Sequence, residues 1–193
     1  MKKALLLAAS VAFIAPQAFA QAKSFEGFSV GANLAVAKST TEPTGVASDS
    51  GNTTSLDLQA QYSLALAPQV VLGLGLTLGT GNNKAGTFTT GQEFVTKNRM
   101  AFDIVPGYAI SSNMMLFGKV SSLSADGAFT LAGVETKKSL SGVGYGFGLR
   151  GLIDKNMFYQ VGYDINKYND VDYGGGSVKE SSSVFSLGVG YKF

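Results

Sequence analysis

Residues 146–151 spell Gly-Phe-Gly-Leu-Arg-Gly, which is the glycine spacing of a dinucleotide-binding loop. Such a loop cradles a pyrophosphate only where a strand precedes it and a helix follows it. Here the segment lies inside a predicted strand and is followed by a short turn. The structural interpretation is therefore favoured: glycines at 142, 144, 146 and 148 leave room for side chains from other strands of a narrow, curved sheet.

Two polar segments carry oxygen ligands of the kind that calcium prefers. Asp170 and Asp172 precede the glycines at 174–176, and Asp49 lies near Asn52. Neither segment has the spacing of an EF-hand or of a calcium-binding nonapeptide repeat. We interpret both as solvated loops and expect no metal site and no cofactor.

Catalysis is limited by what the chain lacks. Its 193 residues include no His and no Cys, so the commonest general base and the thiolate nucleophiles are absent. A pair of carboxylates could still hydrolyse a glycoside, but no two acids are held together in a way that the sequence fixes. We expect no catalytic residues and no enzyme activity.

Residues 1–20 have the pattern of a cleaved signal peptide. Lys2 and Lys3 form the charged start, an apolar stretch follows, and residues 18–20 offer a small-x-small cleavage site. Removing them leaves 13 basic residues against 13 acidic ones, because no acid precedes Glu26. The exported chain, residues 21–193, thus has no basic excess with which to bind nucleic acid.

Beyond residue 20 the apolar residues recur with a period of two, which predicts strands. Glycine makes up 25 of 193 residues and charged residues only 15%, against a usual level of about 25%, so an ordinary soluble surface is not expected. Eight alternating segments can be distinguished: 28–36, 56–64, 70–78, 100–108, 114–122, 143–149, 157–165 and 183–193.

The connections alternate in length. Short turns occupy 65–68, 111–113 and 152–156, and long polar loops occupy 37–54, 80–98, 123–138 and 166–182. Short periplasmic turns, long outer loops and strands of about 9 to 11 residues are typical of outer-membrane barrels. The predicted fold is an all-β, eight-stranded, antiparallel, up-and-down transmembrane β-barrel, closed because an open edge cannot be satisfied in lipid.

The predicted inward face is polar and carries charge of both signs. Its ionisable residues are Asp57, Arg99, Asp103, Lys119, Arg150, Asp164 and Lys192. They could form a plug or line a pore; a plug is favoured because side chains just fill an eight-stranded barrel, although the inward glycines keep the pore alternative open.

Turn positions also suggest registers for two hairpins. Placing Leu64 opposite Val70, and Ile104 opposite Gly118, would set Asp103 opposite Lys119 as an inward ion pair. Pro106 lacks an N–H donor, and with Gly107 it predicts a bulge near the periplasmic rim.

The last eight residues, Ser-Leu-Gly-Val-Gly-Tyr-Lys-Phe, resemble the C-terminal assembly signal of bacterial outer-membrane barrels, through Gly188, Tyr191 and the terminal Phe193. Residues 102–108 and 142–151 are also similar to segments of the small eight-stranded barrels of the OmpX and OmpA transmembrane type, grouped with opacity-like surface antigens and porins. The resemblance implies a Gram-negative outer-membrane location, lipid contact, and periplasmic chaperones and the barrel-assembly machinery as partners. One departure is the absence of Trp from the aromatic girdles.

These expectations leave three functions open. The first is surface interaction, adhesion or envelope integrity, with a host or surface ligand at the Ser-, Thr-, Gly- and Asn-rich outer loops. The second is a narrow porin-like channel for small solutes or ions. The third is a soluble periplasmic lipocalin-like carrier, which would turn its apolar face inward around a ligand.

Overall fold

The computed structural model describes residues 21–43, 47–88, 92–131, 134–172 and 177–193; the predicted signal peptide, residues 1–20, lies outside them. The described chain forms ten strands: β1 (Gly27–Pro43), β2 (Asp49–Ala65), β3 (Val70–Gly79), β4 (Asn83–Phe88), β5 (Gln92–Ala109), β6 (Met114–Leu131), β7 (Val134–Leu152), β8 (Met157–Tyr168), β9 (Val171–Asp172) and β10 (Ser177–Lys192). Among these residues, no helix combines the length and the hydropathy required to cross a bilayer.

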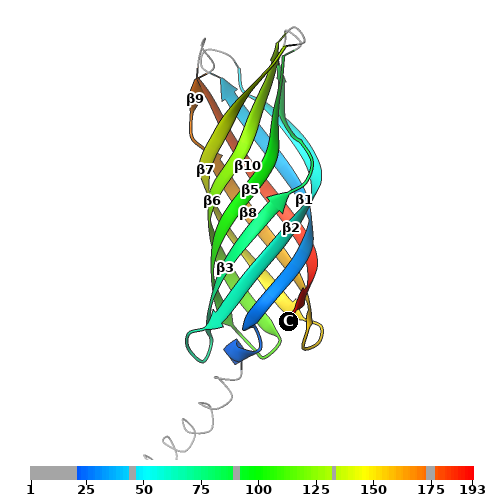
Figure 1. Cartoon of the computed structure of the whole chain (residues 1–193), viewed down its shortest axis with the longest axis vertical. Helices are drawn as coiled ribbons and strands as arrows, with labels where there is room; N and C mark the ends of the chain where they lie inside the picture. Colours follow the sequence, from blue (N-terminus) through cyan, green and yellow to red (C-terminus); the bar gives the residue numbers. More distant parts are fainter. Residues whose placement is uncertain (1–20, 44–46, 89–91, 132–133, 173–176) are drawn as a thin grey trace, which may run out of the picture.

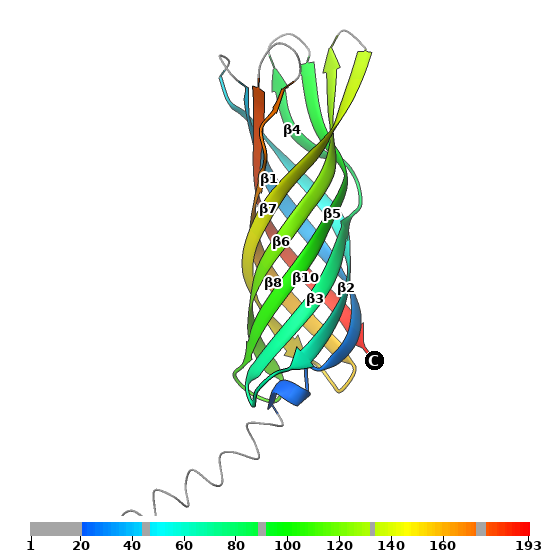
Figure 2. The same ribbon diagram turned by 60° about the vertical axis from the view of Figure 1, so that its left-hand side comes forward.

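Eight of the strands close into an antiparallel barrel (Figures 1 and 2). Their order is β1-β2-β3-β5-β6-β7-β8-β10, and β10 returns to pair with β1. The two short strands lie at the loop end, where β4 pairs with β5 and β9 pairs with β10. The closed wall confirms the predicted eight-stranded barrel and leaves no unpaired edge in its lower part.

The alternation of residue types sorts the side chains between lipid and lumen. In β2, Leu56, Leu58 and Tyr62 point outward and are about half exposed, whereas Gln61 and Ser63 are buried inside. The other strands also point their apolar residues outward and their polar residues inward, so the outer surface carries an apolar band and the interior is polar. A lipocalin-like carrier needs the opposite arrangement, and that alternative is wrong.

All three periplasmic turns close in the same way. Leu66, Ile110 and Ile153 each donate a backbone N–H to the carbonyl four residues later, leaving three-residue loops. In the β2–β3 hairpin this closure places Leu64 opposite Leu72, two residues from the predicted partner Val70. The predicted register is therefore wrong by two residues, although every side chain keeps its predicted face because a strand repeats with a period of two.

The β5–β6 register shows the same error. Closure at Ile110 places Asp103 opposite Ser121, and Ile104 opposite Val120, so the predicted cross-strand pair of Asp103 with Lys119 does not form. Register with β3 also continues through Pro106, which pairs with Leu72 and makes no bulge.

The bulge in β5 lies elsewhere, at Asn98. This residue adopts a left-handed backbone conformation with φ of 49°, and the β5–β6 register shifts between Lys97 and Met100. Asparagine tolerates this conformation better than most residues. The shift changes the phase of the strand, so that Thr96 above the bulge and Arg99 below it both face inward.

The strands continue well beyond the apolar band at the loop end, where loops were predicted. Residues 37–43, 49–54, 92–98, 123–131, 134–138 and 177–182 are strand. Gly81, with φ of +88°, breaks the wall between β3 and β4. The predicted outer loops are thus largely a paired β-sheet extension rather than irregular chain (Figure 1).

Candidate functional site

The lumen is the site that the sequence singled out, and its middle section is organised around Arg150. This side chain is 5% exposed and lies over the rings of Phe158, at 4.5 Å, and Phe117, at 6.0 Å. Its Nη2 donates to Gln160 Oε1 at 2.7 Å and to Gln61 Oε1 at 3.3 Å. The strand order places β7 and β2 on diametrically opposite sides of the wall, so the bond to Gln61 crosses the whole lumen.

Gln160 extends this network to two more residues. Its Nε2 donates to Asn33 Oδ1 at 2.6 Å and to Gln59 Oε1 at 2.8 Å. Four strands, β1, β2, β7 and β8, are thereby joined by neutral amides around one guanidinium. No carboxylate contacts Arg150 among the described residues, so cation–π contact and amide oxygens balance its charge.

The predicted charged residues form separate pairs and clusters. Arg99 Nη2 lies 3.1 Å from Asp57 Oδ1, and Lys119 Nζ lies 2.8 Å from Asp164 Oδ2. Asp103 is fully buried and has hydroxyl partners instead of a cation.

The two hydroxyls that reach Asp103 come from the neighbouring strands. Thr77 Oγ1 donates to it at 2.6 Å and Ser121 Oγ at 2.5 Å. Thr77 lies on β3 and Ser121 on β6, on either side of β5. All of these groups lie at the level of the apolar band.

Above the band, the lumen is closed by a buried acid and an apolar cluster. Glu180 on β10 is 3% exposed, and the Thr96 hydroxyl lies 2.8 Å from both of its carboxylate oxygens. Burial raises the pKa of Glu180 to about 7, against the opposing effects of the Thr96 hydroxyl and the Arg99 charge. Because β5 and β10 are also diametrically opposite, this contact is a second link across the lumen. The adjoining apolar cluster consists of Phe94, Leu123, Ala125, Leu140 and Tyr168.

The periplasmic end is closed by the residues that precede β1. Ala22 and Phe25 insert among Val71, Ala109 and Met115 to form a buried apolar cluster. Glu26 accepts hydrogen bonds from Lys23 Nζ and from the Ala65 N–H, and both interactions lower its pKa. The seventh predicted inward residue lies here: Lys192 Nζ donates to the Glu26 carbonyl at 3.3 Å.

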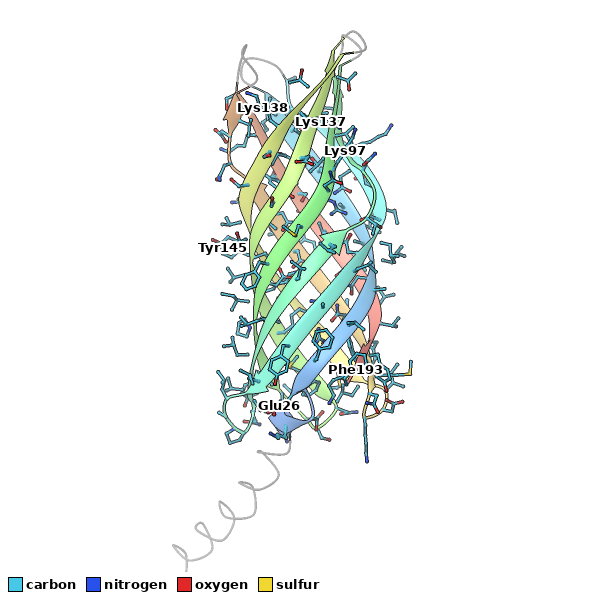
Figure 3. The ribbon with its side chains drawn as sticks, in the orientation of Figure 1. Glu26, Lys97, Lys137, Lys138, Tyr145 and Phe193 are labelled. Atoms are coloured by element: carbon cyan, nitrogen blue, oxygen red, sulfur yellow. The ribbon has the colours of Figure 1, made fainter. Side chains whose placement is uncertain are left out.

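Two residues of the predicted assembly signal, Tyr191 and Phe193, lie at the same end of the barrel, and the third, Gly188, lies at the level of the Arg150 network. Phe193 donates its N–H to the Phe28 carbonyl at 2.8 Å, and its ring lies 5.0 Å from that of Tyr191. Gly188 faces inward against Asn33, where a side chain would collide with the Asn33 amide. Figure 3 shows Phe193 and Glu26 at this end, and Lys97, Lys137 and Lys138 toward the other.

The structure also places the other candidate motifs of the sequence. Residues 146–151 lie within β7 and no helix follows them before β8, so the dinucleotide interpretation is wrong. Asp49 caps the Ser50 N–H, and Asp170 is exposed. The side chain of Asp172 and residues 174–176 are outside the described set, which contains no group of three or more His, Cys, Asp or Glu suited to a metal.

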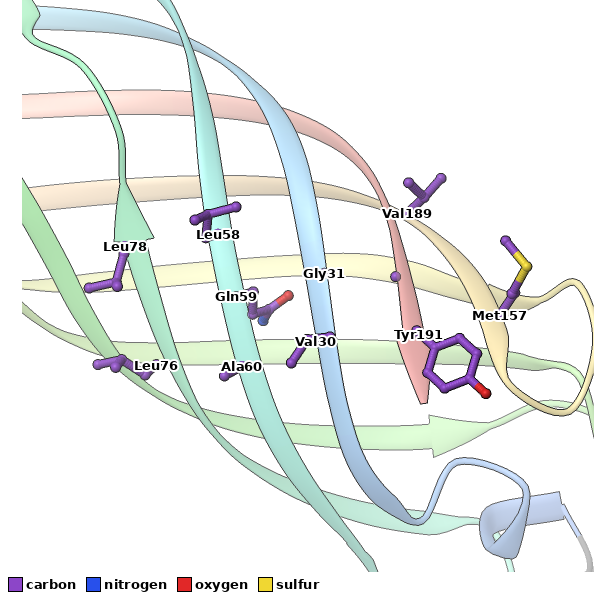
Figure 4. A pocket seen from close by; sticks show the side chains of 11 residues that line it. Val30, Gly31, Leu58, Gln59, Ala60, Leu76, Leu78, Met157, Val189 and Tyr191 are labelled. Atoms are coloured by element: carbon purple, nitrogen blue, oxygen red, sulfur yellow. The ribbon is translucent and has the colours of Figure 1, made fainter. Parts of the chain in front are cut away.

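An apolar hollow lies on the outside of the wall. It is a groove of about 560 Å³ across β1, β2, β3 and β10, with an apolar lining that includes Val30, Leu58, Leu76 and Tyr191 (Figure 4). The small side chain of Ala60, which pairs with Val30 and Leu76, helps to form it. Its apolar lining belongs to the lipid-facing band, and it does not open a path through the barrel.

The candidate site residues predicted from the sequence did not include the uncharged side chains of the lumen or the side chains above the apolar band. Gln59 and Gln61 alternate with apolar residues in β2, which is the signal that could have identified them as inward hydrogen-bonding groups. Thr96 and Glu180 fall in segments predicted as loops, where no apolar alternation marks a face.

Comparisons with known proteins agree with this geometry. The family model described as outer membrane protein beta-barrel domain matches residues 4–193. The chain belongs to this family. It is therefore an outer-membrane β-barrel protein of a Gram-negative envelope. No curated protein matches the chain.

Solved structures support the same fold. Neisserial surface protein A is 20% identical, with a TM-score of 0.63, and the match covers 87% of this chain and 98% of that one. Ail, the attachment invasion locus protein of Yersinia pestis, solved with the heparin analogue sucrose octasulfate, is 16% identical over 87% and 99%, with a TM-score of 0.56. OprG from Pseudomonas aeruginosa is 13% identical over 87% and 96%, with a TM-score of 0.52. At these identities the outer-membrane barrel fold is what the four proteins share.

Proposed function

We propose that this barrel is non-conducting and non-catalytic and acts at the cell surface, in adhesion, another surface interaction or envelope integrity, through its extension above the membrane. The observation that carries the proposal is the pair of links between diametrically opposite walls, Arg150 to Gln61 and Thr96 to Glu180. A lumen crossed by side chains at two heights is a plug that rigidifies the wall. It leaves the exposed end of the barrel as the part that can meet a partner.

The remaining space in the lumen also favours a plug. Two adjoining interior cavities near these networks measure about 40 and 60 Å³, which is room for a few waters. The space beside the glycines that motivated the pore alternative is occupied by neighbouring side chains. A side chain at Gly144 would collide with Asn166, one at Gly146 with Asp164, and one at Gly148 with Phe117. This filling removes the main sequence argument for a channel.

The extension offers a rigid surface for a partner. In β6 and β7 the pairing continues from the apolar band up to Leu131 opposite Val134, so these two strands run about 30 Å beyond Val143, and β5 stays paired with β6 as far as Thr130. Thr136, Lys137, Lys138 and Ser139 are exposed on it. Ail, whose fold this chain shares, is named as an attachment invasion locus protein. Surface attachment is therefore the role to test first.

The plug is tested by conductance of the refolded full chain, residues 21–193, in a planar bilayer. We expect no unitary steps from protein whose folding is verified by heat-modifiable gel migration. Steps that change when Lys119 or Asp164 is neutralised would overturn the plug and support the channel alternative.

The surface role is tested by shortening the β6–β7 hairpin in cells. Residues 127–138 are replaced by Asn-Gly, which joins the register partners Asp126 and Ser139 with a two-residue turn. We expect adherence of the cells to fall to that of a strain lacking the protein. The amount of the variant in the outer membrane and its heat-modifiable migration should not change. Unchanged adherence would contradict a role for this hairpin.

A further inference from the structure

An outward-facing basic patch lies on three adjacent strands at the upper edge of the apolar band. Lys38 on β1 and Lys167 on β8 are exposed and flank β10 on its two sides. Lys38 pairs in register with Ser183, and Lys167 with Ser181. The two serines are alternate residues of β10, so their side chains share the outward face between the lysines.

The height of the patch is fixed by the residues directly beneath it. Two positions below Lys38, Lys167 and Ser183 lie Val36, Ile165 and Phe185, which are 47%, 43% and 51% exposed and belong to the apolar band. The patch is on the side of the long connections, away from the periplasmic turns. Its ammonium groups therefore lie where the headgroups of the outer leaflet begin.

The two ammonium groups are available to a ligand. Among the described residues, neither Lys38 nor Lys167 has an ion-pair or hydrogen-bond partner. The outward acid of these strands, Glu42, lies opposite Lys179, which is a different lysine further up β10. Strand spacing places the Cα atoms of Lys38 and Lys167 roughly 12 Å apart, so both flexible side chains can reach one anion over Ser181 and Ser183.

We propose that Lys38, Lys167, Ser181 and Ser183 form a binding site for the phosphorylated headgroup of an outer-leaflet lipid. The ammonium groups provide charge, the hydroxyls donate hydrogen bonds to phosphate oxygens, and the acyl chains lie against Phe185, Ile165 and Val36. This site is independent of any ligand of the β6–β7 hairpin. It orients the barrel in its membrane and fixes the depth at which the extension begins.

The test is a titration of refolded full chain in neutral detergent with fluorescent lipid A that carries two phosphates. Each single substitution, Lys38→Gln or Lys167→Gln, is expected to weaken binding about five-fold, and the double substitution about 30-fold. Lys38→Arg with Lys167→Arg is expected to retain binding because the charge is kept. Lys155→Gln is the matched control, because Lys155 is also exposed but lies in a periplasmic turn.

Two further arms identify what is recognised. In the first, lipid A without phosphate is titrated into native protein, and its binding should be as weak as that of bisphosphorylated lipid A to the double variant. In the second, inorganic phosphate at millimolar concentration is added to the complex and should not displace the lipid. Equal binding of native protein and the double variant, with heat-modifiable migration showing both folded, would overturn the site. Displacement by inorganic phosphate would overturn the assignment to a lipid.

Discussion

Lys119 Nζ and Asp164 Oδ2 lie 2.8 Å apart although a whole strand separates them. Lys119 on β6 and Asp164 on β8 are both register partners of Gly146 on β7. The ion pair passes over Gly146, and a Cβ at this position would collide with the Asp164 carboxylate. An inward glycine thus serves here to let charges on next-nearest strands meet, instead of leaving the lumen open.

Gly146→Ala should separate this pair and destabilise the barrel by about 2 kcal/mol, the usual size of an overpacking penalty. The measurement is the urea midpoint of the refolded protein, followed by far-ultraviolet circular dichroism because the chain has no Trp. Gly118→Ala is the control, since the nearest atom to its new Cβ would be Pro106 Cγ at 3.7 Å. Equal losses in the two variants would show that Gly146 has no special relation to the pair.

Asp164→Asn tests the pair itself. Removing one partner leaves the Lys119 ammonium inside the barrel without its carboxylate, and a loss of about 3 kcal/mol is expected. Lys119→Met added to Asp164→Asn should recover part of this loss, because the unpaired charge is removed. A double-mutant cycle without a coupling energy would contradict a direct interaction.

The alternation of residue types predicted the wall but could not predict its register. Sliding β6 by two residues leaves each apolar residue outward and each polar residue inward, so the pattern is equally satisfied in both registers. Turn closure at Ile110 decides between them and places Asp103 opposite Ser121, whereas the β6–β7 and β7–β8 registers bring Lys119 to Asp164. The side chains of the upper lumen could not be predicted for another reason. Above the band no lipid requires an apolar outward face, so the residue types do not show which face is inward, and the bulge at Asn98 reverses the phase of β5.

Glu180 should make the barrel less stable as the pH rises. Its pKa is about 7 in the folded chain and 4.5 when unperturbed, so between these values the folded state binds more protons than the unfolded state. The contribution is therefore fully favourable below about pH 4.5, declines through the interval, and is lost above about pH 7. The expected loss between pH 4.5 and 8 is about 3 kcal/mol.

Glu180→Gln isolates this effect from the titration of other acids. The variant keeps a hydrogen-bonding partner for Thr96 but cannot ionise, so its stability at pH 8 should exceed that of native protein, with the difference vanishing near pH 4. Urea midpoints at pH 4, 6 and 8 provide the comparison. Glu42→Gln is the control, because Glu42 is exposed on the neighbouring strand. A difference between native and Glu180→Gln protein that does not vary with pH would contradict the assignment.

Phe193 should matter more for assembly in the cell than for the stability of the finished barrel. Its ring is 68% exposed and contacts Phe28 and Tyr191, so Phe193→Ala removes little buried surface. If the C-terminal residues are bound by the assembly machinery, the variant should refold in detergent like native protein but reach the outer membrane of cells at a several-fold lower level.

Phe147→Ala is the matched control for Phe193, because Phe147 is 67% exposed on the lipid-facing wall and its ring lies beside that of Tyr163. Both variants lose the same outward ring, and only the position in the chain differs. Quantitative blots of heat-modifiable protein in outer-membrane fractions distinguish them, with refolding yield in detergent measured in parallel. Equal outer-membrane levels would remove the assembly role, and a refolding defect confined to Phe193→Ala would make the terminal ring a structural element of the β1–β10 closure instead.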